Sequence, residues 1–531
     1  MVQSEAIETK IKEGVAVVWF KRDLRIFDHQ ALVEALDTKK RILPLYIFEP
    51  ELWNQPDLSV RHLEFLRECV EDLKRQLQQL NLDLVVKVGN AVEVFEDLFK
   101  KEKNISIFSH QETWNYWTYQ RDLAVVRWSK EKCVVWNEYR QLGVFRRLKN
   151  RDEWIRKWRE HLAQEKVLVK KQNIPMYSIS SDSIPSNANL SLKPMQTDLQ
   201  QKGGRKVGVD VLTSFLRTRG ASYRGSISSP NTAEIACSRL SPYLAFGCFS
   251  MREVIQATDK RKSSLGMEVG PAKSQWTRSL NAFKERLRWH CHFIQKLEDE
   301  PEIEFRNLHA AYDKLRVSVG PEEQHKLLAW KEGRTGFPFV DACMRSLEKT
   351  GWINFRMRAM LVSFASFHLW LDWKEPALHL ARYFLDYEPG IHYPQIQMQS
   401  ATTGINAIRI YNPIKQSLEQ DPKGIFIKKW IPELKDVPVE FIHTPWEAKE
   451  LTLDYPAPIV NEAEARKEAA DILYGLKKHI KNNETTTKII VKHASRMNSD
   501  RNRKSRRLEN KKRSPRKKIS HHQGQGVLDL C

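Results

Sequence analysis

Residues 329–373 read AWKEGRTGFPFVDACMRSLEKTGWINFRMRAMLVSFASFHLWLDW, followed by LDYEPGIHYPQ at 385–395 and TTGINAIRIYNP at 402–413. Arg358 lies in an apolar run that we interpret as a buried helix. An arginine in such a helix needs an acidic partner, because an unpaired buried charge is costly. Asp386 and Glu388 are the acidic candidates. The stretch therefore predicts a polar site within a helical core.

Five apolar runs toward the N-terminus predict buried strands, at 15–20, 42–48, 82–88, 105–108 and 134–136. Between the second and third runs, residues 60–80 keep helical spacing of their apolar positions. Strand–helix alternation favours a parallel α/β layer. We therefore predict an α/β plus all-α protein, with the following parts: an α/β domain at 14–140, a linker at 141–207, a helical domain at 208–480 and a basic, disordered tail at 481–531.

The linker and the tail are predicted from composition. Residues 173–194, NIPMYSISSDSIPSNANLSLKP, are rich in Ser, Asn and Pro. Residues 492–518 contain 13 Lys and Arg but only 2 acidic residues, and they carry about half of the net charge of +21. This charge indicates a polyanionic partner, most simply nucleic acid. The rest of the chain is only mildly basic.

Several classes of protein are disfavoured by the sequence. Seven cysteines are scattered without a CxxC pair, which argues against a disulfide framework or a four-cysteine metal cluster. No apolar run is long enough to span a membrane, and the N-terminus lacks the pattern of a secretory signal. His290, Cys291 and His292 are adjacent, so on a helix they point about 100° apart and do not converge on one ion. We predict no metal site.

Three blocks together resemble the photolyase/cryptochrome family. The first is the turn KRDLR at 21–25 with Asp28 after it, and the second is the segment CSRLS at 237–241 before a helical run. The third is GRTGFPFVD at 333–341 with GWINFRMR at 351–358. The resemblance covers about residues 14–470. It implies an N-terminal α/β antenna domain and a C-terminal helical domain that binds FAD.

The resemblance also implies which residues bind FAD. The segment 237–241 grips the diphosphate, with Cys237 in place of the usual Thr. Arg358 pairs with Asp386 beside the flavin ring, and residues 386–388 line the ring and the ribose. The implied set is Tyr223, Cys237, Ser238, Arg239, Leu240, Ser241, Arg358, Asp386, Tyr387 and Glu388. A folate or deazaflavin antenna pigment is common in the family, but its residues are not assignable here, and no iron–sulfur cluster is expected.

The electron path departs from the family pattern. His392 stands near flavin N5, where photolyases place Asn and plant-type cryptochromes place Asp; it is either a tuning residue or a plain polar core residue. Ile396 and Gly320 occupy two of the usual Trp relay positions, and Trp373 matches the middle one. We predict Trp373, His392 and Trp352 as catalytic residues. Another route to FAD remains open through Tyr387, Tyr393, Trp352 or Trp370, and poor photoreduction is the alternative.

The expected substrate is UV-damaged DNA. Arg286 replaces the usual substrate-contacting Glu of cyclobutane-dimer photolyases, and Trp289 matches its aromatic neighbour; Asn354 and Arg356 complete the predicted DNA set. Phe355 and Ala359 replace the His pair of (6-4) photolyases. We therefore expect a deoxyribodipyrimidine photolyase, a carbon–carbon lyase that repairs cyclobutane dimers. The alternatives are a cryptochrome-type photoreceptor and a (6-4) photolyase.

The charge of the tail and the family resemblance also give expectations for partners and location. The basic tail is expected to bind the phosphate backbone, and the protein to be a monomer without a membrane partner. We expect it in the cytoplasm or nucleoid of a bacterium, or in the nucleus of a eukaryote.

Overall fold

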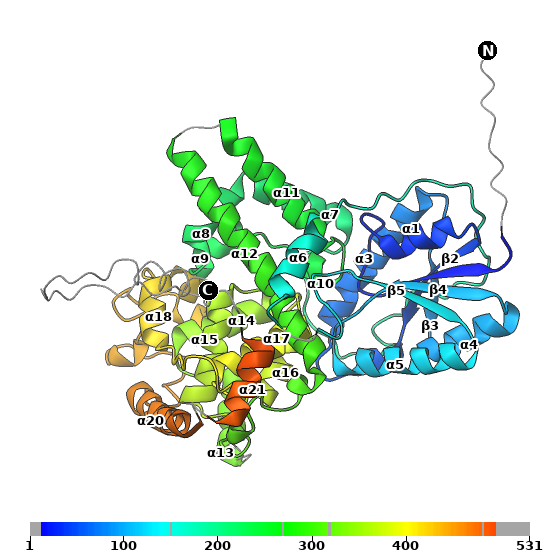
Figure 1. The fold of residues 1–531 in the computed structure, drawn as a ribbon. Coiled ribbons are helices and arrows are strands. Elements are labelled where there is room, and N and C mark those ends of the chain that lie inside the picture. Colours follow the sequence, from blue (N-terminus) through cyan, green and yellow to red (C-terminus); the bar gives the residue numbers. More distant parts are fainter. Residues whose placement is uncertain (1–11, 149–150, 268–269, 317–319, 481–482, 495–531) are drawn as a thin grey trace, which may run out of the picture.

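A sheet domain and a larger helical domain lie side by side in the computed structural model (Figure 1). The structure describes residues 12–148, 151–267, 270–316, 320–480 and 483–494. Within these residues, none of the helices combines the length and apolar character that a membrane span requires.

The five predicted strands form one parallel sheet with the order β3-β2-β1-β4-β5. Val18 in the central strand pairs with Pro44 on one side and Phe108 on the other. The parallel α/β prediction is thus confirmed. The strands are β1 (Val15–Phe20), β2 (Arg41–Phe48), β3 (Val85–Val88), β4 (Ile105–His110) and β5 (Val135–Tyr139).

Alternate residues of β1 belong to two different cores. Val15, Val17 and Trp19 pack with α4 (Ala91–Lys101) and α5 (Tyr116–Glu131). Ala16, Val18 and Phe20 face the opposite way, toward α1 (Gln30–Asp37) and α3 (Val60–Gln78). The second core continues without a break into the helical domain. Successive side chains of a strand point to opposite faces of the sheet. One face of β1 therefore packs only on helices of the sheet domain, and the other face packs into a core shared with the helical domain.

The helical domain contains both Arg358 and Asp386. Its longest helix, α12, runs beside α17 and α11 and crosses the centre of the domain (Figure 1). The helices from here on are α7 (Arg205–Arg217), α8 (Tyr223–Ser226), α9 (Pro230–Ala236), α10 (Ser241–Ala245), α11 (Met251–Ser264), α12 (Pro271–Asp299), α13 (Pro321–Lys331), α14 (Pro338–Thr350), α15 (Phe355–Ser363), α16 (Lys374–Tyr383), α17 (Pro389–Gln399), α18 (Pro413–Gln420), α19 (Ile425–Trp430), α20 (Glu462–Ile480) and α21 (Glu484–His493). The sheet domain also holds the short α2 (Pro50–Trp53).

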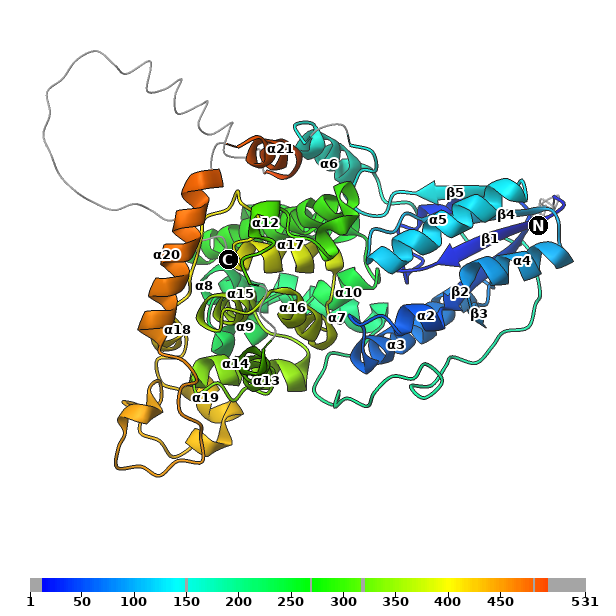
Figure 2. The same cartoon turned by 90° about the horizontal axis from the view of Figure 1, so that it is seen from below.

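The linker contains more structure than its composition predicts. Helix α6 (Trp154–Ala163) buries Trp154, Trp158 and Leu162, which are spaced by four residues and so share one helix face. It packs against α11. After α6 the chain has little regular structure and returns to α7 along one side of the molecule (Figure 2).

Our prediction of a disordered segment from residue 481 is wrong for residues 484–493, which form α21. Thr486, Ile489 and His493 recur at helical spacing and are buried. Only Ile489 in this buried stripe is apolar, which is why composition alone did not reveal the helix. Figure 2 shows α21 next to α6. The strongly basic part of the tail beyond residue 494 lies outside the described residues.

Candidate functional site

The predicted Arg358–Asp386 pair is present and bidentate. Nη1 and Nη2 of Arg358 donate to Oδ1 and Oδ2 of Asp386 at 2.9 and 3.0 Å. Nε of Arg358 donates to the Ile353 carbonyl at 2.8 Å, which fixes the plane of the guanidinium. Burial would raise the pKa of Asp386, but Arg358 and the Ser241 hydroxyl together bring it below its usual value. The carboxylate is therefore held ionised at the start of α17, as a fork–fork pair allows.

The 237–241 turn is held in place from its outer side by two residues. Nη2 of Arg219 donates to the Ser238 carbonyl at 2.8 Å and Nη1 to that of Cys237. The side chain of Gln201 bonds to both the backbone and the guanidinium of Arg239, at 2.9 and 3.0 Å. Arg239 itself has a left-handed backbone with φ of 58°. These bonds hold the turn that ends at the buried Leu240 and the half-buried Ser241.

Arg239 also connects this turn to the 351–358 segment. The centre of its guanidinium lies 4.1 Å from the ring of Trp352, a distance typical of a cation–π contact. Burial raises the pKa of the nearby Cys237 to about 11, so its thiol stays neutral near pH 7. The predicted diphosphate segment, the Trp352 ring and the Arg358–Asp386 pair thus belong to one contiguous site.

Arg286, expected at DNA, lies next to the cofactor set. Burial raises the pKa of Tyr223, and the nearby charge of Arg286 opposes the rise at both Tyr223 and Cys237. Its neighbour Trp289 is half-buried and stacks on Phe293, with ring centres 5.7 Å apart. Arg286 replaces a carboxylate of the family pattern and so places a positive charge beside Tyr223 and Cys237.

Asn354 bonds to a neighbouring loop, and Arg356 bonds to a neighbouring helix. Nδ2 of Asn354 donates to the carbonyls of Ile227 and Ser228 at 3.0 and 2.7 Å, and the residue is only 2% exposed. Asn354 therefore holds the loop before α9 and does not face the outside of the molecule. Nη1 of Arg356 lies 3.4 Å from Oε1 of Gln416 on α18.

His392 is buried and uncharged at neutral pH. Its Nε2 donates to the Ala377 carbonyl at 2.9 Å, which leaves Nδ1 as the acceptor nitrogen. Burial lowers its pKa to about 4. Its ring lies 5.3 Å from that of Tyr387 and 5.2 Å from that of Tyr393. The imidazole is thus an acceptor at neutral pH and not a cation.

The structure shows the surroundings of Trp373 and of the two substituted relay positions, Ile396 and Gly320. Trp373 is fully buried, donates from Nε1 to Oδ1 of Asn307 at 2.7 Å, and lies 6.3 Å from the Tyr393 ring. Ile396 is a buried core residue and Gly320 precedes α13. In the described part of the chain no ring contact joins Trp352 or Trp370 to Trp373.

The sheet domain also contributes to this site, which the sequence motifs did not predict. Arg22 lies 3.4 Å from Glu388 and 4.0 Å from the ring centre of Trp114. Burial raises the pKa of Glu388 to about 7, and Arg22 opposes the shift. Asp57 of the α2–α3 loop accepts from Tyr387. Arg22 stood within the quoted turn at 21–25, but Trp114 and Asp57 belong to no motif that we identified.

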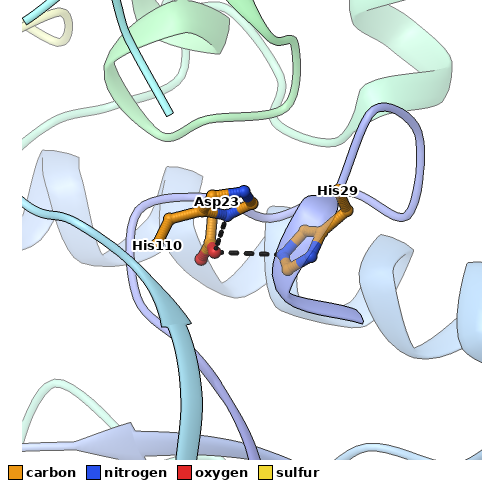
Figure 3. A group of neighbouring side chains, drawn as sticks. All are labelled: Asp23, His29 and His110. Carbon is orange, nitrogen blue, oxygen red and sulfur yellow. Dashed lines mark hydrogen bonds and ion pairs between the residues drawn. The ribbon is translucent and has the colours of Figure 1, made fainter. Parts of the chain in front are cut away.

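Asp23, His29 and His110 come together at metal-like spacing (Figure 3). Oδ2 of Asp23 lies 2.7 Å from Nδ1 of His110 and 3.0 Å from Nε2 of His29. However, the Leu32 amide donates to Nδ1 of His29 at 3.0 Å, so the proton of neutral His29 is on Nε2. A protonated nitrogen cannot ligate a metal. Nδ1 of His110 donates to the ionised Asp23, and Nε2 of His29 contacts the same oxygen without hydrogen-bond geometry; both contacts lower the pKa of Asp23 against burial.

The described residues fit a large polar cofactor. Oδ1 of Asn354 and Oε1 of Glu388 are buried acceptors without a donor among the described residues, and both lie on segments that meet at the Arg358–Asp386 pair. Buried acceptors normally have partners, so these two call for donors from a bound group. Fold and site together define a two-domain protein with a parallel-sheet domain and a helical cofactor domain.

Comparison with known proteins identifies the family. A model described as the FAD binding domain of DNA photolyase matches residues 283–474, and one described as DNA photolyase matches residues 16–144. A deoxyribodipyrimidine photo-lyase of Buchnera aphidicola subsp. Acyrthosiphon pisum is 29% identical over 481 residues, covering 85% of this chain and 95% of that protein. Cryptochrome-1 of Aedes aegypti is 24% identical over 523 residues, covering 87% and 93%.

Solved structures agree with this assignment. An archaeal photolyase from Sulfolobus tokodaii with two FAD molecules has a TM-score of 0.70 at 27% identity, covering 88% of this chain and all of that one. The fold is also that of a class III photolyase from Agrobacterium tumefaciens, with a TM-score of 0.75 at 24% identity, covering 89% of this chain and 100% of that one. The chain belongs to the photolyase/cryptochrome family, and its cofactor is FAD.

Proposed function

We propose that this protein repairs cyclobutane pyrimidine dimers in DNA in a light-dependent reaction. The observation that carries the proposal is the full-length similarity to deoxyribodipyrimidine photo-lyases, since four of them from different bacteria are 28–29% identical over 85% of this chain. The chemistry supplied by bound FAD is electron donation to the dimer under light. The protein itself binds FAD and the dimer, orients them toward each other and excludes water from the site.

The residues take the following roles in this proposal. The 237–241 turn and Tyr223 hold the diphosphate side of FAD, and the Arg358–Asp386 pair holds the ring. Trp289, half-buried and stacked on Phe293, offers an aromatic face to an extruded base. The packing of Ala359, which is 2% exposed, leaves no polar group at a position where (6-4) photolyases carry His. This supports the cyclobutane dimer as the lesion.

The experiment compares three substrates on the reduced, FAD-loaded protein under blue light: oligonucleotides with a cyclobutane dimer, a (6-4) product or no lesion. We expect restored bases only from the first, and none in the dark. Trp289→Ala should weaken binding of dimer DNA about tenfold, since stacking one base contributes about 1–3 kcal/mol, while FAD stays bound. Trp117→Ala, a half-buried Trp on α5, is the matched control. Repair of the (6-4) product alone would replace the proposed lesion.

A cryptochrome-type photoreceptor is the second candidate. Ile396, a buried aliphatic residue where the relay Trp usually stands, favours it, because an altered electron path is compatible with signalling without repair. Absence of repair of both lesions by FAD-loaded protein would select this reading. We also propose that the basic tail binds DNA and that the protein is a monomer. The division of the chain into the four parts given above is likewise a proposal.

A further inference from the structure

A carboxylate and two phenols are buried together between the two domains. Oη of Tyr387 donates to Oδ2 of Asp57 at 2.7 Å, and Oη of Tyr393 lies 3.4 Å from that of Tyr387. Asp57 and both tyrosines are each 2% exposed. Asp57 belongs to the sheet domain, whereas the tyrosines flank the start of α17. The Tyr387 proton thus points at a base that bulk water does not reach.

Asp57 is suited to accept a proton. Its Oδ2 also receives Nδ2 of Asn115 at 3.2 Å, and it forms no ion pair with Lys, Arg or His in the described residues. Burial raises the pKa of Asp57, while the bonds from Tyr387 and Asn115 oppose this shift. Arg22 favours the ionised form from a distance, but no cation pairs directly with Asp57, so the carboxylate can take up a proton at a small cost.

The two tyrosines connect the Arg358–Asp386 end of the site to Trp373. Tyr387 directly follows Asp386, and its ring lies 6.4 Å from that of Tyr393. The Tyr393 ring lies 6.3 Å from that of Trp373, whose indole bonds to Asn307 at the partly exposed end of the path. Every step is a contact between oxidisable rings. Ile396 interrupts any path through its own position, because an aliphatic side chain does not exchange electrons.

We propose that Tyr387 donates electrons to the FAD site and that Asp57 accepts its phenolic proton. Tyr393 and Trp373 extend the path to Asn307. The inference rests on the proposed position of FAD beside Asp386. It does not depend on which lesion is repaired, or on whether any is.

The step balances in electrons and protons. One electron leaves the Tyr387 ring for the light-excited cofactor, the O–H bond breaks, and the proton forms a new O–H bond on Oδ2 of Asp57. The products on the protein are a neutral tyrosyl radical and a carboxylic acid. A thiolate from solution then returns one electron through Trp373 and Tyr393 and becomes a thiyl radical, while the proton moves back from Asp57 to Tyr387. Transfer at 2.7 Å avoids a charged phenol radical in an apolar site.

The test is made on the full-length protein with oxidised FAD and dithiothreitol. FAD occupancy is measured first by flavin absorbance, so that failure of the proposed FAD site is visible as loss of flavin. A light pulse on the native protein should produce a neutral tyrosyl radical in transient absorption and freeze-quench electron paramagnetic resonance. Its formation should slow at least twofold in D₂O. A tryptophan radical alone, or no solvent isotope effect, would overturn the proposal whatever the variants do.

The variants locate the radical. Tyr387→Phe keeps the ring and removes the proton, and should reduce radical yield and FAD photoreduction at least tenfold with flavin still bound. Asp57→Asn keeps the shape and removes the base, and should abolish the isotope effect. Tyr383→Phe, a half-buried tyrosine on α16 outside the path, is the matched control and should match the native protein. An unchanged radical in Tyr387→Phe would show that Tyr387 is not the donor.

Discussion

The Arg22 guanidinium of the sheet domain lies 3.4 Å from the carboxylate of Glu388, next to the Arg358–Asp386 pair of the helical domain. Both Arg22 and Glu388 are largely buried, with side chains 13% and 7% exposed. The turn at 21–25, which the sequence marked only as a family motif, therefore contributes to the proposed FAD site. The predictions below concern FAD occupancy, stability and DNA binding, each of which can be measured.

Breaking the Arg358–Asp386 pair should release FAD. In Arg358→Ala the buried Asp386 loses its bidentate partner, and breaking such a pair costs about 3–5 kcal/mol. We expect at least tenfold lower FAD occupancy, measured by flavin absorbance and fluorescence, and a lower unfolding temperature. Arg156→Ala removes an exposed ion pair with Glu160, which contributes little because water screens it, and serves as control. Full occupancy in Arg358→Ala would remove this pair from the FAD site.

Stability should fall as the pH falls from about 6.5 to 4. Burial lowers the pKa of His392 and His290 each to about 4, from 6.5. Their stabilising effect is complete above the unfolded pKa and is lost as the pH falls through the folded value, because the unfolded chain binds more protons. Urea unfolding at several pH values measures this slope. In His392→Asn the slope should decrease by up to about 1.4 kcal/mol per pH unit. His325→Asn, at an exposed position of α13, should leave it unchanged.

The turn before α14 should tolerate no side chain at Gly336. Its φ is +80°, and an added Cβ would lie 2.3 Å from the Ala457 carbonyl oxygen. Gly336→Ala should cost about 1–3 kcal/mol from the left-handed backbone alone, and more from the clash. Gly475→Ala, on α20 with open space around it, should instead stabilise by about 0.5–1 kcal/mol. Equal unfolding temperatures for the two variants would contradict the turn geometry.

Removing residues 495–531 should flatten the salt dependence of DNA binding. This segment carries most of the basic cluster at 492–518, and each phosphate neutralised contributes about 0.9 to the slope of log affinity against log salt. The cut at 495 spares α21, whose Ile489 and His493 are buried. Fluorescence anisotropy with undamaged duplex DNA measures the slope, and flavin absorbance should show that FAD is retained. An unchanged slope would mean that the tail does not bind DNA.

The sequence predicted the parts of this structure that depend on local pattern. Runs such as 105–108 predicted the strands, because a parallel sheet buried on both faces needs continuous apolar stretches. The Arg358–Asp386 pair followed from the cost of a buried charge. The errors are at segments 154–163 and 484–493, where short helices form because Trp158 and Ile489 find partners elsewhere in the chain. Neither partner is visible in the local sequence.

The site was predictable only within its motifs. Arg286 was assigned to DNA from its position, but its place beside Tyr223 depends on how α12 packs near α8. Asp57 and Trp114 reach the site from the sheet domain, and no spacing rule relates position 57 to position 387. Such long-range contacts follow from the packing of two domains, which a pattern along one chain does not encode.

The face of β1 formed by Ala16, Val18 and Phe20 shares one core with the helical domain. A protease cut in the exposed stretch between α6 and α7 would therefore leave two fragments that remain associated. Their separation would expose an apolar surface that neither fragment can cover alone. The two domains should consequently melt in a single cooperative transition, and an isolated helical domain should aggregate when expressed without its sheet.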